Sequence, residues 1–260
     1  MSKFLNYKGV AIHFSDEGKG EIVVLLHGFL EDISMWNHLQ KTLIKTNRVI
    51  CVDLLGHGKS ECLGYVHTME TMAESVKFVL DSLNIDKAKF IGHSMGGYVA
   101  LALAEKHNNI IDSLCLMNST AQEDSEERKA LRTRAIEMAK RNYEPLVSMS
   151  VANLFSQTTR LNFLVQIDEA KQVALKTPVQ GYIACTEGMK LRKNREQVLS
   201  SAKFKTLIIA GKNDPVLSYN SILKEAERTN TNIVSFPNGH MSHIENVAEL
   251  EQEILVFIKD

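Results

Sequence analysis

Residues 89–97 of the chain read Lys-Phe-Ile-Gly-His-Ser-Met-Gly-Gly. This segment places Ser94 in a Gly-x-Ser-x-Gly pattern, after an apolar run that predicts a strand and before an apolar segment that predicts a helix. A serine on such a sharp turn has a strained backbone that exposes its hydroxyl, and the flanking glycines leave room for the turn. The free N–H groups at the start of the helix point to the same place. We therefore interpret Ser94 as a nucleophile positioned to attack a carbonyl carbon.

The composition is that of one ordinary globular domain. Hydrophobic residues make up 44% of the 260 positions, enough for a substantial core, and the formal net charge is −1. Balanced charge offers no field for nucleic acid or an anionic membrane, and the apolar runs are too short to span a bilayer. The first residues lack an apolar signal core. We expect a cytoplasmic protein whose partner is a small molecule, not nucleic acid or a membrane.

The four cysteines indicate neither a disulfide framework nor a cysteine metal site. Cys51 and Cys115 lie inside apolar runs, where a reduced cysteine behaves as a small hydrophobic residue. No two of the four, the others being Cys62 and Cys185, form a Cys-x-x-Cys pair. We expect all four to be unpaired thiols, and no bound metal.

Apolar runs typical of buried strands alternate with segments of helical periodicity. The strand-like runs are 10–14, 22–26, 48–52, 89–91, 114–117, 206–210 and 232–236, and the clearest helical segments are 34–46, 68–83 and 248–259. This alternation predicts an α/β fold with a mostly parallel sheet covered by helices on both faces. In such sheets the functional site lies at the carboxyl ends of the strands.

One long segment interrupts the alternation. Residues 121–202 contain no strand-like run and carry helical patterns instead. We predict that they form a helical cap inserted into a hydrolase-like core made of residues 1–120 and 203–260, since long insertions at this end of a sheet often cover a site. The alternative is an elaborated pair of connecting helices.

A serine hydroxyl needs a nearby base, and the base needs an acid to orient it. The preferred base is His240, on the loop after the last strand, and the competitor is His243, which could be entering the last helix. A metal-binding interpretation of this histidine pair lacks a further cluster of histidine or cysteine. The preferred acid is Asp214, after the strand 206–210, and the alternative is a simple turn aspartate before Pro215.

The negative charge that develops on the attacked oxygen requires hydrogen-bond donors. One is expected to be the backbone N–H of Met95, at the start of the helix after Ser94. The second is expected to be the backbone N–H of Phe29, on the loop after the strand 22–26.

The chain resembles the α/β-hydrolase superfamily, as a small bacterial serine esterase or lactonase-like member with a helical cap. The matching segments are 25–29, 53–60, 92–97, 211–214 and 239–240. The resemblance implies a catalytic triad of Ser94, Asp214 and His240, no cofactor, and an acyl-enzyme route for esters. It also implies that His27, Asp53 and His57 fix loops rather than take part in catalysis, and we interpret His93 in the same way.

This fold serves many reactions, so the substrate must be argued separately. We predict hydrolysis of a small to medium carboxylic ester or thioester. Segment 239–246 also resembles the SHCHC synthase of the menaquinone pathway, but Tyr98 stands where that lyase has an arginine, which makes a multi-anionic substrate less expected. A lyase of that kind, a carbon–carbon bond hydrolase and a non-catalytic ligand-binding protein remain the alternatives. Apolar residues expected to line the acyl pocket, or else to pack in the core, are Trp36, Leu154, Phe155 and Phe163.

Overall fold

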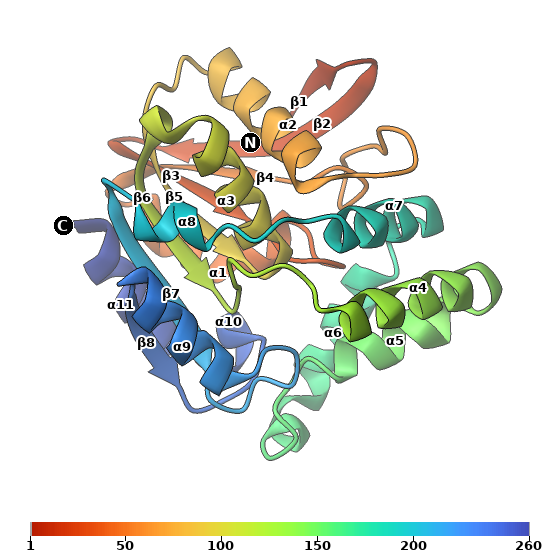
Figure 1. The fold of residues 1–260 in the computed structure, drawn as a ribbon. Helices are drawn as coiled ribbons and strands as arrows, with labels where there is room; N and C mark the ends of the chain where they lie inside the picture. Colours follow the sequence, from red (N-terminus) through yellow and green to blue (C-terminus); the bar gives the residue numbers. More distant parts are fainter. Residues whose placement is uncertain (1, 260) are drawn as a thin grey trace.

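A computed structural model describes residues 2–259. At its centre is a sheet of eight strands in the order β1-β2-β4-β3-β5-β6-β7-β8 (Figure 1). Strand β2 is antiparallel to both of its neighbours, and the strands from β4 to β8 are parallel. The strands are β1 (Ser2–Tyr7), β2 (Val10–Gly18), β3 (Glu21–Leu26), β4 (Asn47–Val52), β5 (Ala88–His93), β6 (Ile111–Met117), β7 (Lys205–Gly211) and β8 (Asn232–Phe236).

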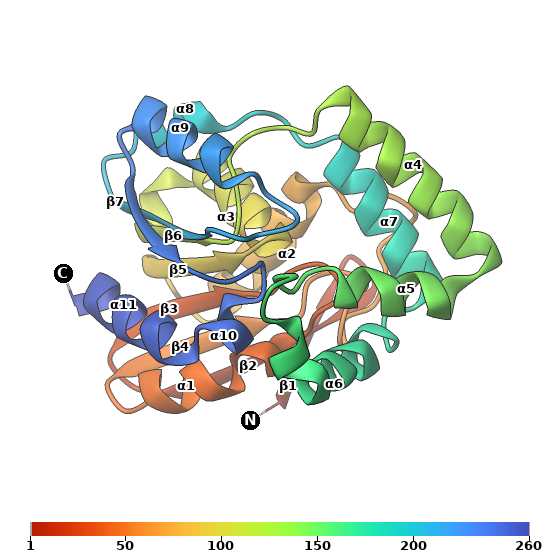
Figure 2. The ribbon, with the colours of Figure 1, turned by 90° about the horizontal axis from the view of Figure 1, so that it is seen from below.

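Helices cover both faces of the sheet, which confirms the predicted α/β class (Figure 2). On one side lie α2 (Met69–Ser82), α3 (Met95–Lys106), α8 (Glu196–Ser200) and α9 (Tyr219–Thr229), and on the other lie α1 (Asn37–Leu43) and α11 (Val247–Lys259). Strand β3 shows why its run is continuously apolar. Val24 and Leu26 pack in the first core, whereas Val23 and Leu25 pack in the second. A strand buried on both faces has no position left for a polar side chain.

Four helices gather beyond one edge of this layered core, in the segment where a cap is predicted (Figures 1 and 2). They are α4 (Glu126–Arg141), α5 (Tyr143–Ala152), α6 (Leu164–Ala174) and α7 (Val179–Lys190). They share a small apolar core of their own, which includes Val147, Ala174, Tyr182 and, from the loop after β3, Leu30. Helix α8 also belongs to the segment 121–202, yet it packs against α3 and α9 on the main core.

Short helical turns complete the chain. They are η1 (Ile33–Trp36), η2 (Asn108–Ile110), η3 (Arg160–Phe163) and α10 (Ser242–Glu245). Across residues 2–259, no helix combines the length and the apolar character that crossing a membrane would require.

Candidate active site

Ser94 occupies the sharp turn between β5 and α3. Its backbone has φ 48° and ψ −114°, a strained conformation for a residue other than glycine. Tight packing enforces the turn, because a Cβ atom on Gly96 would lie 2.2 Å from the carbonyl oxygen of Leu26. The Ser94 N–H donates to the carbonyl of Met117 (3.0 Å), and its own carbonyl accepts from Ser119 Oγ (2.7 Å). The side chain is therefore fixed in place and remains partly exposed.

The structure brings together the three residues that the sequence singled out. The Ser94 hydroxyl lies 2.9 Å from Nε2 of His240, at a distance that allows it to donate a hydrogen bond to that nitrogen. The other ring nitrogen, Nδ1, donates to Oδ2 of Asp214 at 2.7 Å. The side chains of His240 and Asp214 are each 2% exposed, so this chain of hydrogen bonds is shielded from water except at Ser94. Residues from three separate loops at the carboxyl ends of β5, β7 and β8 thus meet at one point.

The surroundings of Asp214 keep it ionised. Burial alone would raise the pKa of Asp214, but the charge and hydrogen bond of His240 and two backbone N–H groups hold that pKa below its usual value. These N–H groups belong to Val216 (2.7 Å) and Leu217 (3.0 Å) and both donate to Oδ1. The carboxylate can therefore orient His240 and stabilise the imidazolium that forms when His240 takes a proton.

Asn118 connects the acid to the loop of the base, a role that we did not predict from the sequence. Its Nδ2 donates to Asp214 Oδ2 (3.3 Å) and to the carbonyl of Gly239 (3.1 Å). Asn118 directly follows β6 and has a positive φ of 45°. The available signal was its position, since it is a polar residue at the carboxyl end of a predicted strand.

A second buried pair, Glu31 and His93, supports the same loops. His93 Nδ1 donates to Glu31 Oε2 (2.7 Å) and His93 Nε2 donates to the carbonyl of His240 (3.0 Å), so both ring nitrogens carry protons. Burial opposes the charge on each partner, but their mutual attraction lowers the pKa of Glu31 to about 2 and raises that of His93. Glu31 Oε2 also accepts from the N–H of Gly28 (2.7 Å). His93 therefore holds Glu31 and the loop of His240 in place beside Ser94, and its non-catalytic role stays a prediction.

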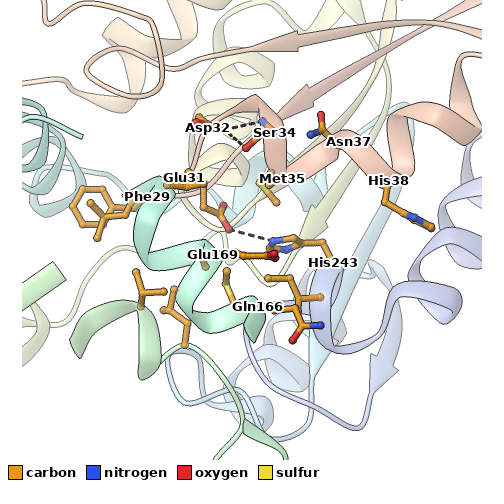
Figure 3. A pocket seen from close by; sticks show the side chains of 17 residues that line it. Phe29, Glu31, Asp32, Ser34, Met35, Asn37, His38, Gln166, Glu169 and His243 are labelled. Carbon is orange, nitrogen blue, oxygen red and sulfur yellow. Dashed lines mark hydrogen bonds and ion pairs between the residues drawn. The ribbon is translucent and has the colours of Figure 1, made fainter. Parts of the chain in front are cut away.

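His243 lies on α10 and contacts this pair rather than Ser94. Figure 3 shows His243 and Glu31 pointing toward each other, with 3.7 Å between Nε2 and Oε1. Glu31, His93 and His243 offer three ligand atoms within 4.8 Å of one another. A cation there would have to displace a hydrogen bond of His93, because both nitrogens of His93 are already engaged. Burial lowers the pKa of His243 to about 4, so its ring is neutral near pH 7.

The loops around the site are held by the residues that the family resemblance assigned to structural roles. His27 Nδ1 donates to the carbonyl of Gly28 (2.7 Å), and its Nε2 accepts from the N–H of Leu54 (2.9 Å). Asp53 accepts from the N–H groups of Ile33 (2.8 Å) and Lys59 (2.8 Å). These bonds fix the loop after β3, which carries Phe29, against the loop after β4.

Two cavities lie between the loops of the sheet core and the helices α4 to α7. The cavity that contains Ser94 has a volume of about 240 Å³ and is bounded by Phe29, His240 and residues of α4, α5 and α7. The second cavity, about 320 Å³, lies between η1 and α6 and contains His243 (Figure 3). Both are lined by Phe29, Leu30, Glu31 and Leu154, so these residues form the wall between them.

Of the four apolar residues expected at the acyl pocket, only Leu154 lines the cavity beside Ser94. Trp36 is fully buried in the second core, under the opposite face of the sheet from α3. Phe155 and Phe163 pack against each other, with ring centroids 6.3 Å apart, in a small apolar cluster that also includes Ile167 and Met241. These three therefore have the alternative role that the sequence allowed, which is packing.

Stability is expected to decrease below neutral pH. Burial lowers the pKa values of His57, His67 and His243 to about 3, 4 and 4. An unfolded chain protonates histidine near about pH 6.5, so between that pH and about 4 the unfolded chain binds protons that the folded chain excludes. Each such histidine lowers the free energy of unfolding by about 1.4 kcal/mol per pH unit of acidification. Thermal denaturation should therefore give a lower melting temperature at about pH 5 than at pH 7.

Other groups offset part of this effect. The raised pKa of His93 stabilises the folded state below about pH 6.5. Burial raises the pKa values of Glu225 and Glu245, so these groups also oppose the decrease in the free energy of unfolding at mildly acidic pH. Replacing His67 with Gln should make the decrease shallower. Replacing His38 with Gln is the matched control, because the His38 side chain is 64% exposed. A melting temperature that stays level or rises from pH 7 to pH 5 would contradict the prediction.

Known proteins resemble this chain over nearly its whole length. A family model described as alpha/beta hydrolase fold matches residues 21–247. A protein of Acinetobacter baylyi named 3-oxoadipate enol-lactonase 1 is 29% identical over 254 residues, which cover 96% of this chain and 92% of that protein. A thermophilic esterase from Thermogutta terrifontis, solved with malate bound, has a TM-score of 0.92 at 29% identity and covers 100% of this chain and 98% of its own. The enol-lactonase from Burkholderia xenovorans LB400 has a TM-score of 0.90 at 24% identity, with 99% and 100% covered.

Proposed function

This chain belongs to the alpha/beta hydrolase fold family and is a hydrolase, and from that premise we propose that it cleaves a small to medium carboxylic ester or thioester through an acyl-enzyme on Ser94. The observation that carries the proposal is the continuous hydrogen-bonded chain from the Ser94 hydroxyl through His240 to Asp214. A nucleophile matched to a base and an oriented acid is the arrangement that acyl transfer needs.

The proposed reaction has two halves. Ser94 Oγ attacks the carbonyl carbon while His240 Nε2 takes the hydroxyl proton, and Asp214 stabilises the resulting imidazolium. His240 then gives this proton to the leaving alcohol or thiol as the acyl-enzyme forms. Water, activated by His240 in the same way, attacks the acyl-enzyme and releases the acid and free Ser94.

Two backbone N–H groups are proposed to bind the oxyanion. Met95 is the first residue of α3, where an N–H has no partner inside the helix. Phe29 lies on the loop that approaches the nucleophile so closely that a Cβ on Gly28 would be 3.2 Å from Ser94 Cβ. Preorganised donors of this kind each stabilise the transition state by about 3–4 kcal/mol.

The relatives support an ester-type bond as the target. The named activities of two of them, an esterase and an enol-lactonase, both concern carboxylic esters, because a lactone is a cyclic ester. The cavity of about 240 Å³ beside Ser94 fits a small to medium substrate. We also propose a cytoplasmic location, which is supported by four unpaired cysteines in the described chain.

A series of p-nitrophenyl esters from acetate to decanoate tests this function, with the Ser94→Ala protein as the blank. We expect turnover that depends on Ser94 and reaches an optimum at short to medium chain length. We also expect a fluorophosphonate to label the peptide that contains Ser94, as mass spectrometry can determine. Absence of turnover above the blank would contradict the ester assignment and would favour a lyase, a carbon–carbon bond hydrolase or a ligand-binding protein.

A further inference from the structure

Arginine side chains gather on the cap side of the cavity that contains Ser94. Arg128 and Arg132 both line this cavity and are four residues apart on α4, so they lie on the same face of the helix. Arg192, just after α7, places its guanidinium 4.2 Å from the ring centroid of Tyr98, another residue of the cavity wall. Tyr98 stands where the SHCHC synthase has an arginine, and in this chain the ring of Tyr98 is covered by Arg192, an arginine from another part of the sequence.

The carboxylate of Asp124 forms ion pairs with all three arginines. Asp124 accepts a hydrogen bond from Arg132 Nε at 2.5 Å, forms an ion pair with Arg192 Nη1 at 2.6 Å, and lies 3.9 Å from Arg128 Nε. Within residues 2–259 no other ion pair involves these arginines, which leaves two positive charges uncompensated beside the cavity. The proposed catalytic machinery adds one negative charge, because His240 is neutral while it acts as the base and so does not offset the ionised Asp214. Glu31 adds none, because it is paired with a His93 ring that carries both protons.

The two guanidinium groups at the cavity are held in place before any ligand arrives. Asp124 fixes Arg132 through Nε, and no described residue is hydrogen-bonded to the two terminal nitrogens of Arg132. Arg128 Nη1 donates to the carbonyl of Val216 (3.0 Å), which ties α4 to the loop of Asp214. The Arg132 side chain is only 15% exposed, so its charge is poorly hydrated. A planar guanidinium in this state matches the two oxygens of a carboxylate.

We propose that Arg132, assisted by Arg128, binds a free carboxylate on the substrate, so that the site prefers half-esters of dicarboxylic acids to neutral esters. The other cavity residues include the apolar side chains Leu30, Leu154 and Met189, which suit the hydrocarbon chain between the two ends of such a molecule. The inference rests on the proposed function at Ser94 and adds the class of substrate. The reaction consumes one water and yields a dicarboxylic acid and an alcohol.

A matched pair of substrates tests this preference. The mono-p-nitrophenyl ester of glutaric acid carries the carboxylate, and p-nitrophenyl 5-methylhexanoate replaces that carboxylate with an isopropyl group. We expect the wild-type kcat/KM to be about 10- to 100-fold higher for the half-ester, the range for a charge-assisted hydrogen bond. Arg132→Met should remove this preference, mainly by raising KM for the half-ester. Arg132→Lys should keep part of the preference, because it keeps the positive charge but loses the planar pair of N–H donors that can bind both carboxylate oxygens.

The control variant is Arg134→Met, which removes an exposed arginine from the same helix and should leave the preference unchanged. Equal kcat/KM values for the two esters, unaffected by Arg132→Met, would overturn the carboxylate site and leave the ester hydrolase intact. Arg128→Met provides a second variant if Arg132→Met does not fold, and it should reduce the preference in the same direction.

A binding experiment tests the carboxylate site independently of ester hydrolysis. The Ser94→Ala protein is titrated by calorimetry with monomethyl glutarate and with dimethyl glutarate. We expect tighter binding of the monomethyl ester, weakened about 10- to 100-fold when Arg132→Met is added. Equal binding of the two compounds, or no binding of either, would overturn the carboxylate site. Selective binding without Ser94-dependent hydrolysis of any ester would instead reject the proposed function and keep the site.

Discussion

Replacing Ser94 with Ala is expected to reduce kcat for a hydrolysed p-nitrophenyl ester by at least about 10⁴-fold. The substitution removes the only atom that can form the acyl-enzyme in the proposed route, whereas the oxyanion donors of Met95 and Phe29 stay in place. A small residual rate above that of water is therefore expected. Steady-state and single-turnover kinetics with the same ester measure both effects.

The fold should tolerate this change. The strained φ of 48° at position 94 is imposed by the packing around Gly92 and Gly96, which the substitution leaves intact. Circular dichroism and the melting temperature should thus match those of wild type closely. Ser82→Ala, which changes an exposed residue at the end of α2, is the matched control and should keep full activity. Turnover that survives in folded Ser94→Ala would reject Ser94 as the nucleophile.

Replacing His240 with Ala is expected to have an effect of similar size, also at least about 10⁴-fold in kcat, because Ser94 then has no base. Ser94 and His240 are proposed to act together, so the effects of replacing them on kcat should not add. The double variant with Ser94→Ala should therefore be slower than either single variant by only a small factor. Kinetics of the three proteins on one ester measure this coupling.

His243→Ala is the matched control for His240, since it removes a neighbouring histidine that contacts Glu31 rather than Ser94. Its neutral ring, with a pKa of about 4, makes no hydrogen bond to the serine, and we expect kcat within about tenfold of wild type. The opposite result, with His243→Ala inactive and His240→Ala active, would move the base to His243.

The proposed reacting residues can be singled out from the sequence because their signals are local. A nucleophile on a strand-to-helix turn requires a particular glycine pattern within five residues, and Gly92 and Gly96 supply it around Ser94. Asp214 and His240 each lie four residues beyond the end of a run that predicts a buried strand. Parallel strands bring such loops to one edge of the sheet, so the position in the chain already implies proximity.

The sequence identifies the surrounding network poorly because its contacts join residues that are distant in the chain. Asn118 and Glu31 have no motif of their own, and the partners that tie them to the site, Asp214, Gly239 and His93, are 62 to 121 residues away. Trp36 and Phe155 show a different limit of the sequence, which could not tell whether they line the acyl pocket or pack in the core. Large apolar side chains fit a substrate pocket and a core equally well in sequence, and packing places both of them in the interior.

The sequence by itself therefore determined the layered α/β core and the chain order of the proposed nucleophile, acid and base, because buried strands and sharp turns restrict which residues can occupy them. Only the tertiary structure decided which residues of the predicted cap line the cavity that contains Ser94. Helix α4 is polar along most of its length, so its periodicity does not distinguish the face with Arg128 and Arg132 from the exposed face with Arg134. That distinction depends on how α4 packs against α7 and the loop of Asp214, which is a property of the folded chain.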